Sequence, residues 1–169
     1  MCSSDLFLFS LLVGIFLYKK FEHRNTAILG AFIGGVFVDL DHLIDYILAF
    51  GWHFNLVYFL KGYEFLQSDK IYIFLHAWEW VLLLFIAYYL LRIKKIIKPR
   101  KKLMIFILAV ACSLTFHLLI DTYLDATTTR AYFISYRIKN HFDLKSLVSP
   151  KHWLKHQKMK RNLPFVVIY

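Results

Sequence analysis

Three carboxylates and one imidazole interrupt an apolar stretch that runs from Ala27 to Phe50. They are Asp39, Asp41, His42 and Asp45. Ionisable side chains are costly in an apolar segment of membrane length, and by default they mark a functional site. Carboxylate oxygens and imidazole nitrogens are also ligands for divalent metals such as zinc. The stretch therefore indicates a metal site, or else a pathway for protons or cations.

Two further apolar stretches carry the same kinds of side chain. His76 and Glu79 lie three residues apart in the stretch Ile71–Leu91. His117 and Asp121 lie four residues apart in the stretch Leu103–Leu124, so a helix would place them one turn apart on one face. We therefore expect three separate helices to contribute to one polar site.

The expected depths of these side chains in a membrane agree with each other. The short basic loop between Arg92 and Lys102 predicts that this end of the helices is cytoplasmic. At ~1.5 Å per residue, Asp39 then lies ~18 Å beyond the cytoplasmic start of its helix, and His117 lies ~21 Å beyond the start of its own. His76 lies roughly 8 Å below the outer end of the third stretch. All three fall in the outer half of the bilayer, at one level.

Composition and segment lengths predict an all-α, polytopic membrane helix bundle. Hydrophobic residues make up 59% of the 169 residues, well above the share in a soluble domain. About four transmembrane helices are expected, at Leu6–Tyr18, Ala27–Phe50, Ile71–Leu91 and Leu103–Leu124. The first stretch is shorter than the ~20 residues that a span requires, so we expect a first span that is truncated at its outer end. The predicted domains are a bundle over residues 1–129 and a basic amphipathic surface tail over residues 130–169.

Charge and cysteine content narrow the functional classes. The net charge of +10 comes mostly from loops and the tail, which favours anionic membrane lipids as partners, with no specific nucleic acid expected. Two cysteines exclude a disulfide framework and a cysteine-based zinc motif. Arg130 and Arg137 are predicted either to hold a phosphate near the metal or to anchor lipid head groups. Gly30 and Gly34, spaced as in Gly-x-x-x-Gly, would permit close helix contact.

Three short motifs carry a resemblance to a known family. Val38-Asp39-Leu40-Asp41-His42 resembles the Pro-Asp-Ile-Asp-His motif of the YdjM-like inner-membrane metal-dependent hydrolases. The segment Phe74–Ala77 is similar to that family's Thr-His-Ser segment, and Phe116–Asp121 is similar to its Ser-His-x-x-x-Asp motif. The resemblance covers roughly Ala27–Thr129. It implies an integral protein of a bacterial or archaeal inner membrane and a distant similarity to zinc-dependent phospholipase C and single-strand nucleases.

The resulting hypothesis is a membrane-embedded metal-dependent hydrolase that acts on a phosphoester or lipid-like substrate through a metal-activated water. The predicted metal ligands are Asp39, Asp41, His42, His76, His117 and Asp121. Glu79 and Asp41 are the predicted catalytic groups, with Glu79 as the candidate base. The expected cofactor is Zn²⁺, as one or two ions. The four polar residues from Asp39 to Asp45 would cover roughly 160° of a helix surface, too wide for all of them to bind one ion, so we expect either a division into ligands and supporting residues or two ions.

Two alternatives remain open at this stage. An ion- or proton-coupled membrane transporter would use the same acidic residues as a pathway. A non-catalytic membrane scaffold would use them as a buried hydrogen-bonded cluster between helices. Asp45 and Asp125 are expected to lie outside the ligand set, as supporting or interfacial residues.

Overall fold

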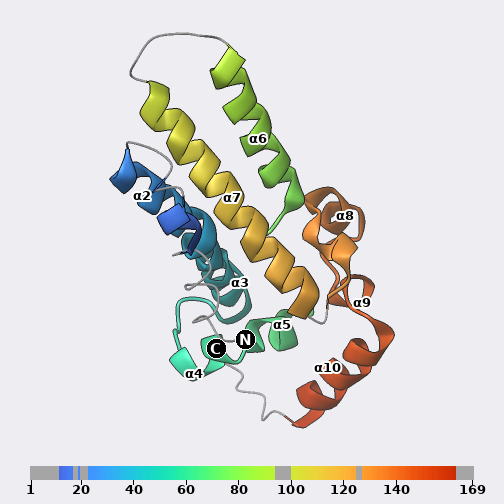
Figure 1. Ribbon diagram of the computed structural model, residues 1–169. Helices are drawn as coiled ribbons and strands as arrows, with labels where there is room; N and C mark the ends of the chain where they lie inside the picture. The colour runs from blue at the N-terminus through green and yellow to red at the C-terminus, as the bar shows by residue number, and fades with distance from the viewer. Residues whose placement is uncertain (1–11, 17–18, 20–22, 94–99, 125–126, 163–169) are drawn as a thin grey trace. The chain divides into compact units, whose positions relative to one another are not determined.

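The computed structural model describes residues 12–16, 19, 23–93, 100–124 and 127–162. These residues form helices and connecting segments, and the described part of the chain contains no named strand. The predicted all-α class is therefore confirmed. In chain order the helices are α2 (Arg24–Gly35), η1 (Phe37–Leu40), α3 (Asp41–Phe50), α4 (Leu56–Leu60), α5 (Tyr63–Ser68), α6 (Trp78–Ile93), α7 (Arg100–Leu124), η2 (Thr129–Tyr132), α8 (Ile134–Lys139), α9 (Leu144–Leu147) and α10 (Pro150–Asn162) (Figure 1).

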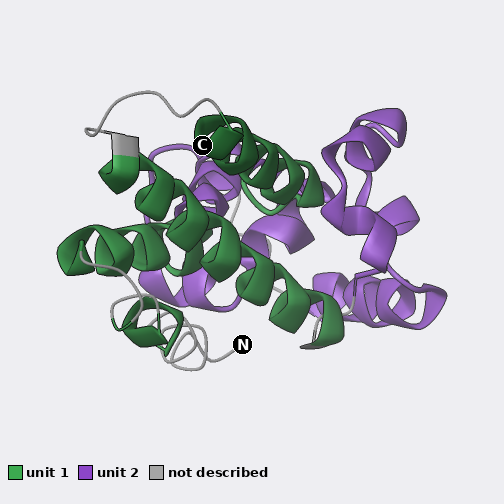
Figure 2. Cartoon of the chain, turned by 45° about the horizontal axis from the view of Figure 1, so that its top comes forward, with its two compact units in different colours: residues 1–39, 75–124 green, residues 40–74, 125–169 purple. Residues whose placement is uncertain are grey.

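The chain divides into two compact units that alternate along the sequence. Unit 1 comprises residues 1–39 and 75–124, and unit 2 comprises residues 40–74 and 125–169 (Figure 2). The domains predicted from the sequence differ, with residues 40–74 in the bundle and a tail that starts at residue 130. The structure thus places the connection after α3 with the C-terminal segment rather than with the bundle helices.

Unit 1 is built around α7, which packs between α2 and α6 (Figure 1). Small residues let α2 and α7 come close together. A Cβ added to Gly30 would lie 2.7 Å from the Phe106 carbonyl oxygen, and one added to Gly34 would lie 2.4 Å from that of Val110. Both distances are shorter than van der Waals contact. The close helix contact predicted from the two glycines is therefore confirmed.

One described helix is long and apolar enough to cross a membrane. It is the segment Lys101–Tyr123 of α7. A second span is obtained only if α2 and the segment Phe37–Phe50 are counted together across the break at Val36. Helix α6 has 16 residues and reaches ~24 Å, short of a ~30 Å hydrocarbon core. The expected four-span bundle is therefore not confirmed, and much of the first predicted span, residues 6–11 and 17–18, lies outside the described residues.

The second predicted span is not one continuous helix. Helix α2 ends at Gly35, and the 3-10 helix η1 separates it from α3. The successive residues Gly34 and Gly35 explain the break, because glycine in a helix costs about 1 kcal/mol relative to alanine. Asp39 lies in η1 and the other three polar residues lie in α3, so the four residues do not share one helix surface. The prediction that they cover 160° of a single helix is therefore wrong.

The third predicted span also begins later than expected. Residues 71–77 are not helical, and α6 starts only at Trp78. In unit 2, the Asp45 carboxylate accepts hydrogen bonds of 3.0–3.3 Å from the backbone N–H groups of Tyr72 and Ile73. Arg137 donates to the carbonyl oxygens of the same two residues. Side chains distant in sequence thus satisfy backbone groups that a helix would otherwise pair.

The C-terminal segment is folded rather than spread over a surface. Ile71, Ala131, Leu144 and Leu147 form a buried apolar cluster in unit 2. The Arg137 side chain is fully buried. Exposed basic residues occur along this segment, at Arg130, Lys139 and Lys145 and in α10. Arg137 differs from them, because it is buried and donates to backbone carbonyls.

Candidate metal centre

Helix α7 presents two metal-ligating side chains in unit 1. His117 and Asp121 are one turn apart, and the His117 Nε2 atom lies 3.1 Å from Asp121 Oδ2. Both residues are buried. The four-residue spacing in the sequence therefore produces the shared face that it predicts.

A second imidazole reaches the same point from the non-helical segment before α6. His76 Nε2 lies 3.0 Å from His117 Nε2 and 3.7 Å from Asp121 Oδ2. The two rings meet edge to face. His76 is buried, with 1% of its surface exposed. The prediction that the second and third motifs converge is confirmed, although His76 does not come from a helix.

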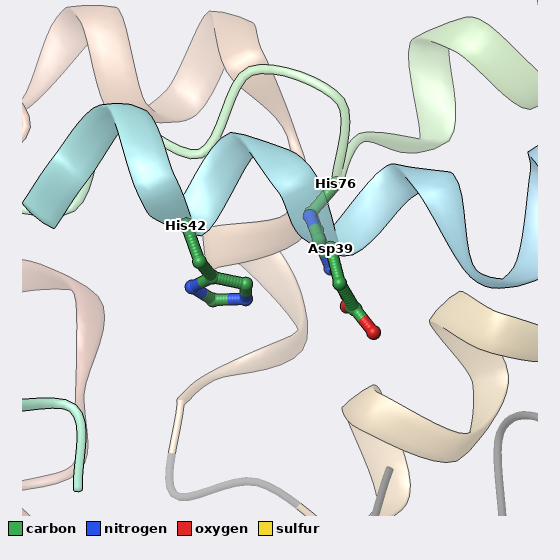
Figure 3. Close-up of side chains that lie close together, drawn as sticks. All are labelled: Asp39, His42 and His76. Carbon is green, nitrogen blue, oxygen red and sulfur yellow. The ribbon is translucent and has the colours of Figure 1, made fainter. Parts of the chain in front are cut away.

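Asp39 in η1 supplies the fourth group. Its Oδ1 atom lies 3.3 Å from His76 Nε2 and 3.4 Å from His117 Nε2. Figure 3 shows the Asp39 side chain beside His76. The Asp39 side chain is 37% exposed, whereas that of Asp121 is 8% exposed. Asp39 is therefore the solvent-facing member of the group.

The distance between the two imidazole nitrogens, and the distances from them to each carboxylate, fit a tetrahedral ion. Zinc bonds of ~2.0–2.1 Å to nitrogen and oxygen give ligand-to-ligand distances of about 3.3–3.4 Å in a tetrahedron. The measured nitrogen–nitrogen and nitrogen–oxygen distances run from 3.0 to 3.7 Å around that value. His76, His117 and Asp121 alone already form a group whose ligand atoms are close enough to share one ion.

A backbone carbonyl fixes the orientation of the His117 ring. His117 Nδ1 lies 3.0 Å from the Gly35 carbonyl oxygen. A carbonyl oxygen only accepts, so Nδ1 must carry the hydrogen and donate it. In the neutral ring Nε2 then presents its lone pair to His76, Asp39 and Asp121. Metal-bound histidines are usually held by such a second hydrogen bond.

The lone pairs that meet here outnumber the available hydrogens. With its hydrogen on Nδ1, a neutral His117 has none to donate from Nε2, and a hydrogen on His76 Nε2 is shared among three acceptors. Protonation of His117 adds one more hydrogen. A divalent cation at the centre would satisfy both nitrogens and both carboxylates at once. The group is therefore able to hold a metal ion.

No protein-family model, curated protein or solved structure matches this chain. The resemblance to the YdjM-like family, and the activity that it implies, therefore stay predictions. The structure itself shows a helical protein with a buried group of histidine and aspartate side chains that is able to hold a metal ion.

Asp41, His42 and Glu79 are not among these four residues. Asp41 and His42 belong to unit 2, where Asp41 is buried and the His42 ring packs edge-on against Phe65 at 5.8 Å. Figure 3 also labels His42, which opens the first turn of α3 with Asp41. Glu79 lies in the first turn of α6, half-buried, and its role as a base stays a prediction. Asp125 falls outside the described residues.

The role of the Gly35 carbonyl in orienting His117 was not predicted from the sequence. The Gly34-Gly35 pair could have indicated it, because this pair ends α2 and leaves carbonyl oxygens of the last helical turn without a partner inside that helix. Asp45 was expected to support the site or lie at an interface, and the structure shows it holding the Tyr72–Ile73 backbone in unit 2.

Proposed function

We propose that this protein is a membrane-embedded, metal-dependent hydrolase whose metal is held by His76, His117, Asp121 and Asp39. The observation that carries the proposal is the meeting of two imidazole Nε2 atoms and two carboxylates at tetrahedral ligand spacing. A ligand set of two nitrogens and two oxygens suits zinc.

The unequal burial of the ligands supports catalysis over a purely structural metal. Structural zinc sites are closed by four protein ligands, whereas catalytic sites keep one position for water. The side chains of His76, His117 and Asp121 are at most 8% exposed, and Asp39 is the one of the four that is open to solvent. A zinc ion supplies a water that ionises near neutral pH. Asp39 would either act as the fourth zinc ligand or accept a proton from that water.

A phosphoester is the proposed substrate class, and the inner membrane is the proposed location. The family resemblance supports the substrate, because the related enzymes cleave phosphoesters. The apolar segment Lys101–Tyr123 supports the membrane, and it carries His117 and Asp121. Substrates with a lipid character would meet a site on such a helix directly.

The test uses the full-length protein purified in a non-ionic detergent and dialysed against trace zinc. We expect about one zinc per chain and zinc-dependent hydrolysis of bis(p-nitrophenyl) phosphate. His117→Ala should lower zinc affinity more than 100-fold, beyond the 10–100-fold typical of losing a supporting residue. The matched control His53→Ala removes an exposed histidine from unit 2 and should bind zinc as the wild type does.

Two outcomes would contradict the proposal in different ways. Equal zinc content in wild type, His117→Ala and His53→Ala would refute the metal site. Stoichiometric zinc that is lost in His117→Ala, with no hydrolysis of phosphomonoesters, phosphodiesters or carboxylic esters, would refute the hydrolase while leaving the metal site in place.

A further inference from the structure

Unit 2 contains a cavity of about 330 Å³. All of its described lining residues belong to this unit. Its volume lies at the small end of the range of about 300–1,000 Å³ found for small-molecule sites. It is large enough for one small organic molecule.

The floor of the cavity is apolar and is part of the core of the unit. Ile71, Ala131 and Leu144 line it, and the same three side chains belong to the buried cluster that holds unit 2 together. Leu66 and Tyr132 extend this floor and are also buried. Because these side chains are fixed by the packing of the unit, the cavity does not have to form when a ligand arrives.

The lining of the cavity also contains lysine and histidine side chains, whose charge is positive when they are protonated. Lys61 and Lys155 line the cavity together with three histidines, and the described lining residues include no aspartate or glutamate. Two of the histidines are already engaged, because His152 Nδ1 lies 2.7 Å from the Ser149 hydroxyl and His156 pairs with Asp69 at 2.8 Å. The two lysines of the lining are exposed, and the Lys61 ammonium lies 5.7 Å from the centre of the Tyr63 ring.

We propose that unit 2 binds a single-chain amphiphile with an anionic head group, its alkyl chain on the apolar floor and its head toward Lys61 and Lys155. An alkyl chain suits a floor without charged groups, and the carboxylate or phosphate head suits the two lysines. The volume admits one chain of moderate length rather than a two-chain lipid. The proposal stands apart from the hydrolase function and does not depend on it.

The test measures binding of ten-carbon amphiphiles to the full-length protein in phosphatidylcholine nanodiscs by titration calorimetry, with empty nanodiscs as the blank. Decyl phosphate and decanoate represent the two sources of an anionic head, and decanol and decyltrimethylammonium are the neutral and cationic comparisons. We expect saturable binding of one anionic ligand per chain, and decyl phosphate and decanoate together decide whether phosphate or carboxylate is preferred. Shortening the chain by two methylenes should weaken binding about 15-fold.

Matched variants separate the cavity from the surrounding lipid. Lys61→Gln and Lys155→Gln should each weaken decyl phosphate binding about two- to fivefold, as expected for partly solvated ion pairs, and leave decanol binding unchanged. The control Lys151→Gln removes an exposed lysine that lies in α10, as Lys155 does, but does not line the cavity. This control should have no effect on binding. Val148→Trp should fill the cavity and abolish binding. His117→Ala should bind the amphiphile as the wild type does.

Several results would overturn the proposal. One is equal binding of all four amphiphiles, or binding that persists in Val148→Trp, since either indicates partition into lipid. Another is a loss of binding in Lys151→Gln equal to that in Lys155→Gln, which indicates a diffuse charge effect. A third is binding that appears only after residues 163–169 are removed, because the occupant would then be the apolar end of the chain itself.

Discussion

Replacing Gly34 with alanine should disturb the metal site from a distance. The added Cβ would lie 2.4 Å from the Val110 carbonyl oxygen and 3.0 Å from two further Val110 backbone atoms. Reaching an ordinary contact requires α2 and α7 to separate by about 1 Å, and a backbone atom cannot swing aside as a side chain can. Gly35 is the next residue, so its carbonyl moves from 3.0 Å to about 4 Å from His117 Nδ1, beyond hydrogen-bond range.

Two magnitudes follow for Gly34→Ala. The overpacking should lower the free energy of unfolding by about 1–3 kcal/mol. Losing the hydrogen bond that orients a metal-bound histidine should lower zinc affinity about 10–100-fold. Zinc affinity is measured by competition with a chromogenic chelator, and stability by thermal unfolding of the metal-free protein in detergent.

A matched glycine serves as the control for this prediction. A Cβ at Gly14 would lie 3.4 Å from the Ala31 Cβ, an ordinary contact, so Gly14→Ala should leave zinc affinity within about twofold of the wild type. If Gly34→Ala and Gly14→Ala bound zinc equally well, the reasoning that links helix packing to the His117 orientation would be refuted.

Three further predictions concern single side chains. Asp39→Asn should keep one zinc per chain, because three buried ligands remain, and should slow phosphodiester hydrolysis about 100-fold; loss of zinc would contradict this. Arg137→Met should destabilise the protein by about 2–4 kcal/mol, because the part-buried carbonyls of Tyr72 and Ile73 lose their donor; a change under about 0.5 kcal/mol in thermal unfolding would count against it. Burial raises the pKa of Glu64 from 4.5 to about 7, so its folded state holds a proton that the unfolded state releases. Glu64 should therefore lower wild-type stability by up to about 3 kcal/mol as pH rises from 5 to 8, and Glu64→Gln should make the fall of stability with pH smaller by that amount in denaturant titrations; parallel slopes would exclude a contribution from Glu64.

The parts of the site that are local in sequence were predictable. His117 and Asp121 follow from a four-residue spacing in a long apolar helix, and that helix is present as expected. This pair depends on helical geometry alone, which the sequence pattern carries directly. The residue counts for Asp39 and His76 assumed continuous helices, and the structure has neither of them: Asp39 lies in η1 and His76 precedes α6.

The parts that depend on contacts between distant residues were not predictable. A long apolar run is consistent with one helix, and nothing local shows that Asp45 and Arg137 hold Tyr72 and Ile73 in a non-helical conformation. The break between α2 and α3 had a local signal in Gly34-Gly35, but glycine pairs also occur inside membrane helices, where close packing favours them. The structure shows that the pair does both here: it admits α7 and it ends α2.

X-ray absorption at the zinc edge of the zinc-loaded, full-length protein tests the central claim most directly. The site described above predicts two imidazole ligands and one or two further oxygens at about 2.0–2.1 Å, with no sulfur at about 2.3 Å. The imidazole signal should fall by half in His76→Ala. Zinc bound through sulfur, or an imidazole signal that is unchanged in His76→Ala, would contradict the assignment of His76, His117, Asp121 and Asp39 as the metal centre.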